Sequence, residues 1–273
     1  MFLLNDRQWF LSAVLVYGFG ALYSVFLWRS GFRRDNHIIY AVLLAGFLLQ
    51  TWSMILRGAS FSRCPVNNLY EATAFIVWTM GAVYMVLGLW PRLRFLGAFL
   101  SHILFGIGIF ALMPTLDFNP AAVQPAHEMR SLHAALTLLA CGGFGLSAAS
   151  SLMLLTQEHN LKFNKLRAVT SLLPSIERLE MVAGVTMVAA FCLLTLGMIS
   201  GSLWLKSSKI VYSKHDPIVL WTVLIWLFYL ALLLLHWKFG IRGRRFARYA
   251  VGAFLFLMLT FWGFFLLSPM HHP

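Results

Sequence analysis

The sequence has few charged residues and few cysteines, and each shortage excludes a class of protein. Only 11% of its 273 residues are charged, whereas 60% are hydrophobic. A water-soluble domain of this size could not hide so much apolar surface in its core. The three cysteines, Cys64, Cys141 and Cys192, form no Cys-x-x-Cys pair. This spacing argues against a thiol–disulfide carrier and against a zinc site.

Long apolar runs are what the sequence has in abundance. A helix needs about 20 apolar residues to cross roughly 30 Å of hydrocarbon. Eight such runs occur, over residues 9–28, 37–56, 70–90, 95–113, 131–156, 179–204, 217–239 and 247–268. The short alternating segments of a membrane β-barrel are missing. We therefore predict an all-α integral membrane bundle of eight transmembrane helices, a single domain over residues 1–273, in the lipid bilayer of the cell (inner) membrane.

The basic residues predict how the bundle is oriented. The net charge is +12, but lysine and arginine gather at the ends of the apolar runs and not on one face. This distribution favours a topology signal and no nucleic acid as partner. With both termini outside, the inner side holds 14 of the 21 basic residues. Two longer outer connections then precede the third and fifth runs, and Ser175 is expected to begin a helix on the inner side.

Three of the nine histidines occupy informative places in this topology. His133 falls at the outer mouth of the fifth run, His271 at the outer mouth of the eighth, and His236 within the inner third of the seventh. Two imidazoles that converge from different helices are what a six-coordinate haem iron needs as axial ligands. Each histidine could instead be an interfacial polar anchor. Gln50 and His102 also lie inside apolar runs. Hydrogen bonding between helices explains their presence there as well as a functional role does.

Several blocks of the sequence resemble a known family. The segments "LLPSIERLEMVAGVTMVAAFCLLTLGMISGSLW", "DPIVLWTVLIWLFY" and "GIRGRRFARYAVGAFL" resemble the cytochrome c assembly proteins of the CcsA/ResC type. The earlier "CPVNNLYEATAFIVW" is similar to the Asn-Leu-Tyr-Glu segment of that family. The likeness runs from about residue 45 to the carboxyl end.

The resemblance implies a function. Proteins of this family present haem at the outer face to an apocytochrome c, together with a second, ResB-like membrane protein. The resemblance assigns His133 and His271 as axial ligands of the haem iron and His236 as a relay ligand. It places Trp204, Tyr212, Asp216 and Trp221 in a tryptophan-rich outer loop that covers the haem. No nucleophile triad, general base or phosphate loop is visible, so we expect a component of an attachment complex and not an enzyme.

The outer loop departs from the family pattern. Lys209, Ser213 and His215 stand where the family has tryptophans, and flat indoles cover a porphyrin in a way that lysine and serine cannot. The degenerate loop is similar to that of the HemX/YpjD-like subgroup. Two hypotheses stay open: a haem-handling protein of cytochrome c assembly, and a haem-free membrane regulator or scaffold. A solute transporter is weaker, because paired glycine- or proline-interrupted spans are missing.

Overall fold

The computed structural model describes residues 5–29, 37–62, 64–66, 68–117, 128–162, 174–207 and 217–267. Over these ranges the chain is helical and contains no strand. The eight α-helices are α1 (Asp6–Arg29), α2 (His37–Phe61), α3 (Leu69–Leu87), α4 (Leu96–Ala111), α5 (Glu128–Lys162), α6 (Ile176–Ser207), α7 (Pro217–Lys238) and α8 (Gly243–Leu267). Each predicted run corresponds to one helix, which confirms the all-α prediction.

Seven of the described helices are long and apolar enough to cross a membrane, so the chain is a multi-pass membrane protein. The exception is α4, whose 16 residues span roughly 24 Å. Two short 3₁₀ turns, Pro91–Leu93 and Pro114–Leu116, flank α4 and lie just outside the two ends of the predicted run. In contrast, α5 has 35 residues and continues past its predicted run. Hydropathy detects the lipid-compatible part of a helix, and polar residues continue the helix beyond it.

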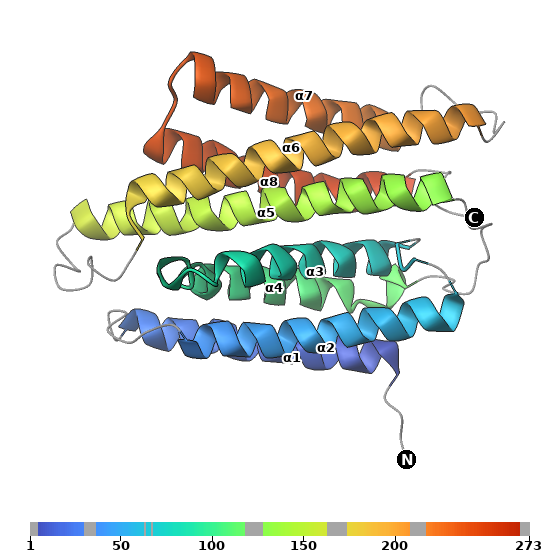
Figure 1. Cartoon of the computed structure of the whole chain (residues 1–273), viewed down its shortest axis with the longest axis horizontal. Coiled ribbons are helices and arrows are strands. Elements are labelled where there is room, and N and C mark those ends of the chain that lie inside the picture. Colours follow the sequence, from blue (N-terminus) through green and yellow to red (C-terminus); the bar gives the residue numbers. More distant parts are fainter. Residues whose placement is uncertain are drawn as a thin grey trace.

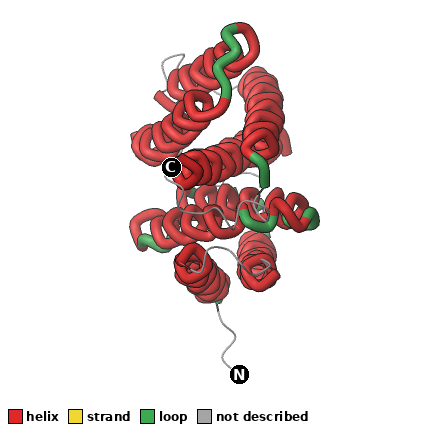
Figure 2. The backbone as a smooth tube through the Cα atoms, turned by 90° about the vertical axis from the view of Figure 1, so that its left-hand side faces the viewer, coloured by secondary structure: helices red, strands yellow, loops and turns green. Residues whose placement is uncertain are grey.

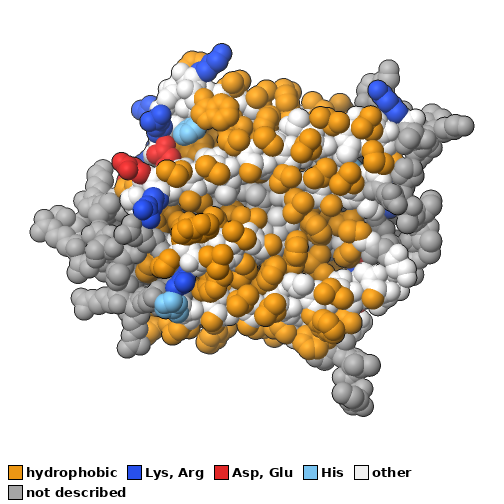
Figure 3. Space-filling model, in the orientation of Figure 1, with side chains coloured by type: hydrophobic (Ala, Val, Ile, Leu, Met, Phe, Trp, Pro, Cys, Tyr) orange, Lys and Arg blue, Asp and Glu red, His pale blue; other side chains and the backbone are white. Residues whose placement is uncertain are grey.

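The helices lie antiparallel to their chain neighbours and stack in pairs (Figures 1 and 2). The α1–α2 pair packs on α3 and α4, α3 and α4 pack on α5, and α5 packs on α6 and α8. Asp6 at the start of α1 and Leu267 at the end of α8 lie at one end of the bundle, here named the terminal end. The opposite end, named the basic end, carries most of the lysines and arginines visible on the described surface (Figure 3).

Polar groups inside the apolar helices tie neighbouring helices together. Gln50 of α2 is buried; its Oε1 accepts a hydrogen bond from the Tyr17 hydroxyl of α1 at 2.8 Å, and its Nε2 donates to the Ala74 carbonyl of α3 at 2.8 Å. Hydrogen bonding between helices therefore accounts for Gln50. His102 differs, because its ring is exposed and its Nδ1 bonds the Ala98 carbonyl of its own helix.

Tryptophan and threonine form a second set of ties. Four indole N–H groups donate to threonine hydroxyls on other helices: Trp78 to Thr51, Trp221 to Thr260, Trp226 to Thr195 and Trp262 to Thr73, at 2.9, 2.7, 3.0 and 3.2 Å. Each of these hydroxyls donates its own proton to the carbonyl four residues earlier. Its oxygen is thereby oriented to accept the indole proton. Much of the tryptophan content thus serves helix packing.

Candidate functional site

His133 lies in the second turn of α5, at the terminal end, and faces α6. Its Nδ1 is 2.7 Å from the Gly197 carbonyl oxygen. A carbonyl can only accept, so the ring proton is on Nδ1 and Nε2 keeps its lone pair. Histidines that bind metals are commonly oriented by such a bond from the other ring nitrogen. The structure therefore presents His133 in the tautomer that a haem iron requires.

The close approach of α5 to α6 depends on two glycines, Gly197 and Gly201, in the segment "GMISG". A Cβ atom at Gly201 would lie 2.6 Å from Nδ1 of His133, and one at Gly197 would lie 2.7 Å from Cγ2 of Thr137. Any side chain at Gly201 would displace the imidazole. This pair was not among the residues predicted from the sequence, although Gly-x-x-x-Gly in an apolar run is a recognised signal of close helix packing.

His236 lies in the last turn of α7, at the basic end, and has the same tautomer. Its Nδ1 is 2.9 Å from the Ile241 carbonyl oxygen, which leaves Nε2 as an acceptor. Gly240 makes this possible, because its φ of 62° turns the chain back and the Ile241 N–H donates to the Leu235 carbonyl at 3.3 Å. The Nε2 atom faces α6, where a Cβ atom at Gly184 would lie 3.9 Å away.

The structure separates some predicted site residues and does not describe others. His133 and His236 lie at opposite ends of the bundle formed by α5 to α8. Trp204 is half-buried in the last turn of α6, at the same end as His133. Trp221 is 7% exposed and uses its indole N–H on Thr260 of α8. His271, Tyr212 and Asp216 lie outside the described residues, so the convergence of His133 with His271 stays a prediction.

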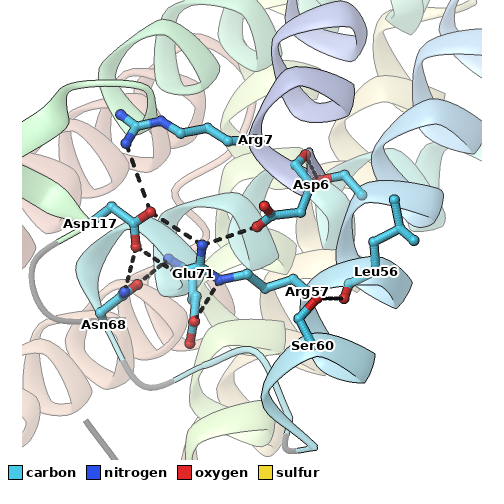
Figure 4. A network of polar contacts seen from close by, with 9 residues as sticks. Asp6, Arg7, Leu56, Arg57, Ser60, Asn68, Glu71 and Asp117 are labelled. Atoms are coloured by element: carbon cyan, nitrogen blue, oxygen red, sulfur yellow. Dashed lines mark hydrogen bonds and ion pairs between the residues drawn. The ribbon is translucent and has the colours of Figure 1, made fainter. Parts of the chain in front are cut away.

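A buried ionic cluster, here named the Arg57 cluster, lies at the terminal end of the other half of the bundle (Figure 4). Arg57 of α2 donates from Nε to Glu71 at 2.9 Å, from Nη1 to Asp6 at 3.0 Å and from Nη1 and Nη2 to Asp117. The Arg57 side chain is 7% exposed, and the three carboxylate side chains are between 1% and 10% exposed. Asn68, which caps α3, donates to Asp117 at 2.8 Å.

The Arg57 cluster joins the starts of α1 and α3, the end of α2 and the turn after α4. The predicted second run ended at residue 56, just before Arg57, whereas α2 extends to Phe61 and includes Arg57. The three carboxylates lie 14, 51 and 60 residues away along the chain, so no local pattern pairs them. The sequence signal that could have pointed to this cluster was a charged residue, Arg57, directly after an apolar run. A buried guanidinium requires such partners.

Comparison with known proteins places this architecture in a family. The sequence pattern of the family described as "Cytochrome C assembly protein" matches residues 66–272. The chain is 25% identical over 262 aligned residues to Protein HemX of Bacillus subtilis (strain 168), which covers 95% of both chains. It is 27% identical over 302 aligned residues to the cytochrome c biogenesis protein CcsA of Synechococcus sp. (strain RCC307), which covers 97% of this chain and 94% of that relative. Relatives of both predicted kinds, the CcsA type and the HemX type, are therefore found.

Proposed function

Because this chain belongs to the cytochrome C assembly protein family, we propose that it handles haem during cytochrome c biogenesis. It binds haem within the cell (inner) membrane and relays it toward the outer face for attachment to apocytochrome c. The name of the CcsA relative supports this role. The lipid bilayer is its solvent and a ResB-like membrane protein its partner.

The tautomer of the two histidines carries the proposal. His133 and His236 each give the Nδ1 proton to a backbone carbonyl of another segment, which leaves Nε2 available for iron. Neutral imidazole with a free Nε2 is the donor that haem proteins use at the axial position. The donor set thus fits haem. His102 shares the tautomer, but its ring bonds only to its own helix.

Each end of the bundle has a separate task. The basic end faces inward, because lysine and arginine gather on the inner side of membrane proteins (Figure 3). His236 holds haem there, and His133 with His271 holds it at the terminal end. Haem supplies the vinyl groups, and the apocytochrome supplies the thiols, for the thioether bonds. The chain orients these reactants and provides no catalytic group of its own.

A haem spectrum tests the proposal. The protein is purified from cells supplied with haem, and the reduced spectrum is recorded for the parent, His133→Ala, His236→Ala and the control His102→Ala. We expect bis-histidine Soret and α bands in the parent, altered bands in the first two variants and an unchanged spectrum in the control. A parent without bound haem, or bands that survive both substitutions, would refute the proposal.

A second function is favoured by the outer loop. Lys209, Ser213 and His215 replace indoles that would cover a porphyrin, and the HemX relative matches nearly the whole chain. The alternative is a haem-free membrane regulator or scaffold that acts through partner contacts. Deleting the gene separates the two functions. Loss of mature c-type cytochromes, restored by a plasmid copy, would contradict the alternative, and normal cytochrome c levels would support it.

A further inference from the structure

Unpaired polar atoms are concentrated in one half of the bundle. Among the described residues, the buried side-chain oxygens without a hydrogen-bond partner are the Tyr229 hydroxyl of α7 and two atoms of α5, Ser151 Oγ and Glu158 Oε2. Tyr229 is 1% exposed and Ser151 is fully buried. All three belong to the half that carries His133 and His236. A hydroxyl buried in this way without a partner is costly.

The contrast with the α1–α4 half shows that the chain can satisfy such groups. There the buried Tyr17 hydroxyl donates to Gln50, and the Tyr84 hydroxyl donates to the Arg94 carbonyl at 2.9 Å. Tyr229 instead stacks on Phe144 of α5, with ring centroids 3.5 Å apart and planes 13° from parallel. Phenylalanine would fill the same space without an unpaired oxygen. Packing alone therefore does not explain the tyrosine.

The stack of Phe144 on Tyr229 shows which positions of α5 and α7 lie at the same depth in the bundle. The helices α5 and α7 run in the same direction (Figure 1). Seven residues, or about 10.5 Å, beyond Phe144 and Tyr229 stand Ser151 on α5 and His236 on α7. A seven-residue step returns to nearly the same helix face. Ser151 and His236 thus lie at one depth, and Tyr229 lies two turns closer to the terminal end.

Contacts with α6 support the same register. Ser147, one turn before Ser151, donates to the Ala183 carbonyl at 2.8 Å. The next residue of α6, Gly184, faces Nε2 of His236. One turn of α6 therefore touches α5 and the imidazole of α7 together. The free lone pair of His236 and the two unpaired hydroxyls belong to one stretch of the bundle interior.

We propose that the hydroxyls of Tyr229 and Ser151 donate hydrogen bonds to the propionate carboxylates of a haem whose iron is bound by His236. The assignment rests on the proposed function and adds two binding residues to it. Carboxylates inside a membrane need donors, and bonds from neutral hydroxyls to an ionised acceptor are stronger than neutral ones. Glu158 is left out, because its carboxyl group has the same chemistry as a propionate and does not complement it.

A titration with two probes tests the assignment. The full chain is freed of haem, placed in lipid nanodiscs and titrated with haem or with haem dimethyl ester, whose propionates are esterified. The Soret band reports binding. In Tyr229→Phe and Ser151→Ala we expect haem affinity to fall roughly tenfold to a hundredfold. We expect ester affinity to stay at the parental value, since the ester lacks the ionised acceptor.

Two controls separate binding from packing. Ser150→Ala removes a hydroxyl that already donates to the Leu146 carbonyl of its own helix at 3.0 Å, so both affinities should remain parental. The melting temperature of Tyr229→Phe should equal or exceed that of the parent, because the ring stack is kept and no described hydrogen bond is lost. In Tyr17→Phe, which breaks the bond to Gln50, it should fall.

The outcomes are distinct. Selective loss of haem affinity at an undiminished melting temperature supports the assignment. Parental haem affinity in Tyr229→Phe overturns the assignment and leaves the proposed function intact. In that case the propionates would be bound by water or by the exposed arginines at the start of α8. An equal loss for haem and ester also overturns it, since packing would be the cause. A parent that binds neither probe refutes the proposed function together with the assignment.

Discussion

Replacing Arg57 by methionine should be among the most destabilising single changes in the described chain. The substitution keeps an unbranched apolar stem but removes the guanidinium that bonds Asp6, Glu71 and Asp117. Three carboxylates, each at most 10% exposed, would lose their main counter-charge. Breaking a buried ion pair from one side typically costs about 3–5 kcal/mol. Thermal unfolding in detergent, followed by tryptophan fluorescence, should show a fall in melting temperature on the order of 10 °C.

The matched control is Arg7→Met. The Arg7 side chain is 31% exposed, and its Nη1 lies 3.8 Å from Asp117. Such a partly exposed pair contributes about 1 kcal/mol or less, and the bond from Nη2 to the Leu112 carbonyl at 2.6 Å adds a comparable amount. We expect a fall in melting temperature well under half of that in Arg57→Met.

Neutralising the carboxylates should reverse the effect. In Arg57→Met combined with Asp6→Asn, Glu71→Gln and Asp117→Asn, the three former carboxylates nearly keep their shapes and no buried charge of the cluster is left uncompensated. Part of the lost stability should return, because the main penalty of breaking a buried ion cluster from one side is the charge that is left uncompensated. An Arg57→Met variant with the parental melting temperature, or a combined variant less stable than Arg57→Met alone, would refute this role of the buried charges.

Gly201 and Gly240 offer further predictions, with Gly252 as the control for the first. Gly201→Ala places a methyl group 2.6 Å from Nδ1 of His133; it should weaken haem binding and lower the melting temperature, whereas Gly252→Ala, with open space around its Cβ position, should raise stability by up to about 1 kcal/mol. Gly240→Ala forces a φ of 62° on a residue with a side chain and should cost about 1–2 kcal/mol. It should also shift the haem spectrum, because the Ile241 carbonyl orients His236; an unchanged spectrum would contradict that role.

The sequence by itself determined the elements of this protein. Each apolar run satisfies its own backbone as a helix in lipid, so their number and approximate places follow from local composition. Short-range chemistry was equally predictable: Ser175 precedes α6, and its hydroxyl accepts from the Arg178 N–H at 3.3 Å, as expected of a helix cap. The family resemblance, carried by local blocks, was confirmed for the same reason.

Only the tertiary structure decided which helix faces meet. The carbonyl that fixes the tautomer of His133 is 64 residues away, and the carboxylates of the Arg57 cluster are up to 60 residues away. Nothing in the sequence distinguished Tyr229, with its unpaired hydroxyl, from Tyr17, which is bonded to Gln50. Hydropathy varies along one helix, whereas a hydrogen bond between helices depends on the rotation and depth of both partners. Packing of the complete bundle sets those two quantities.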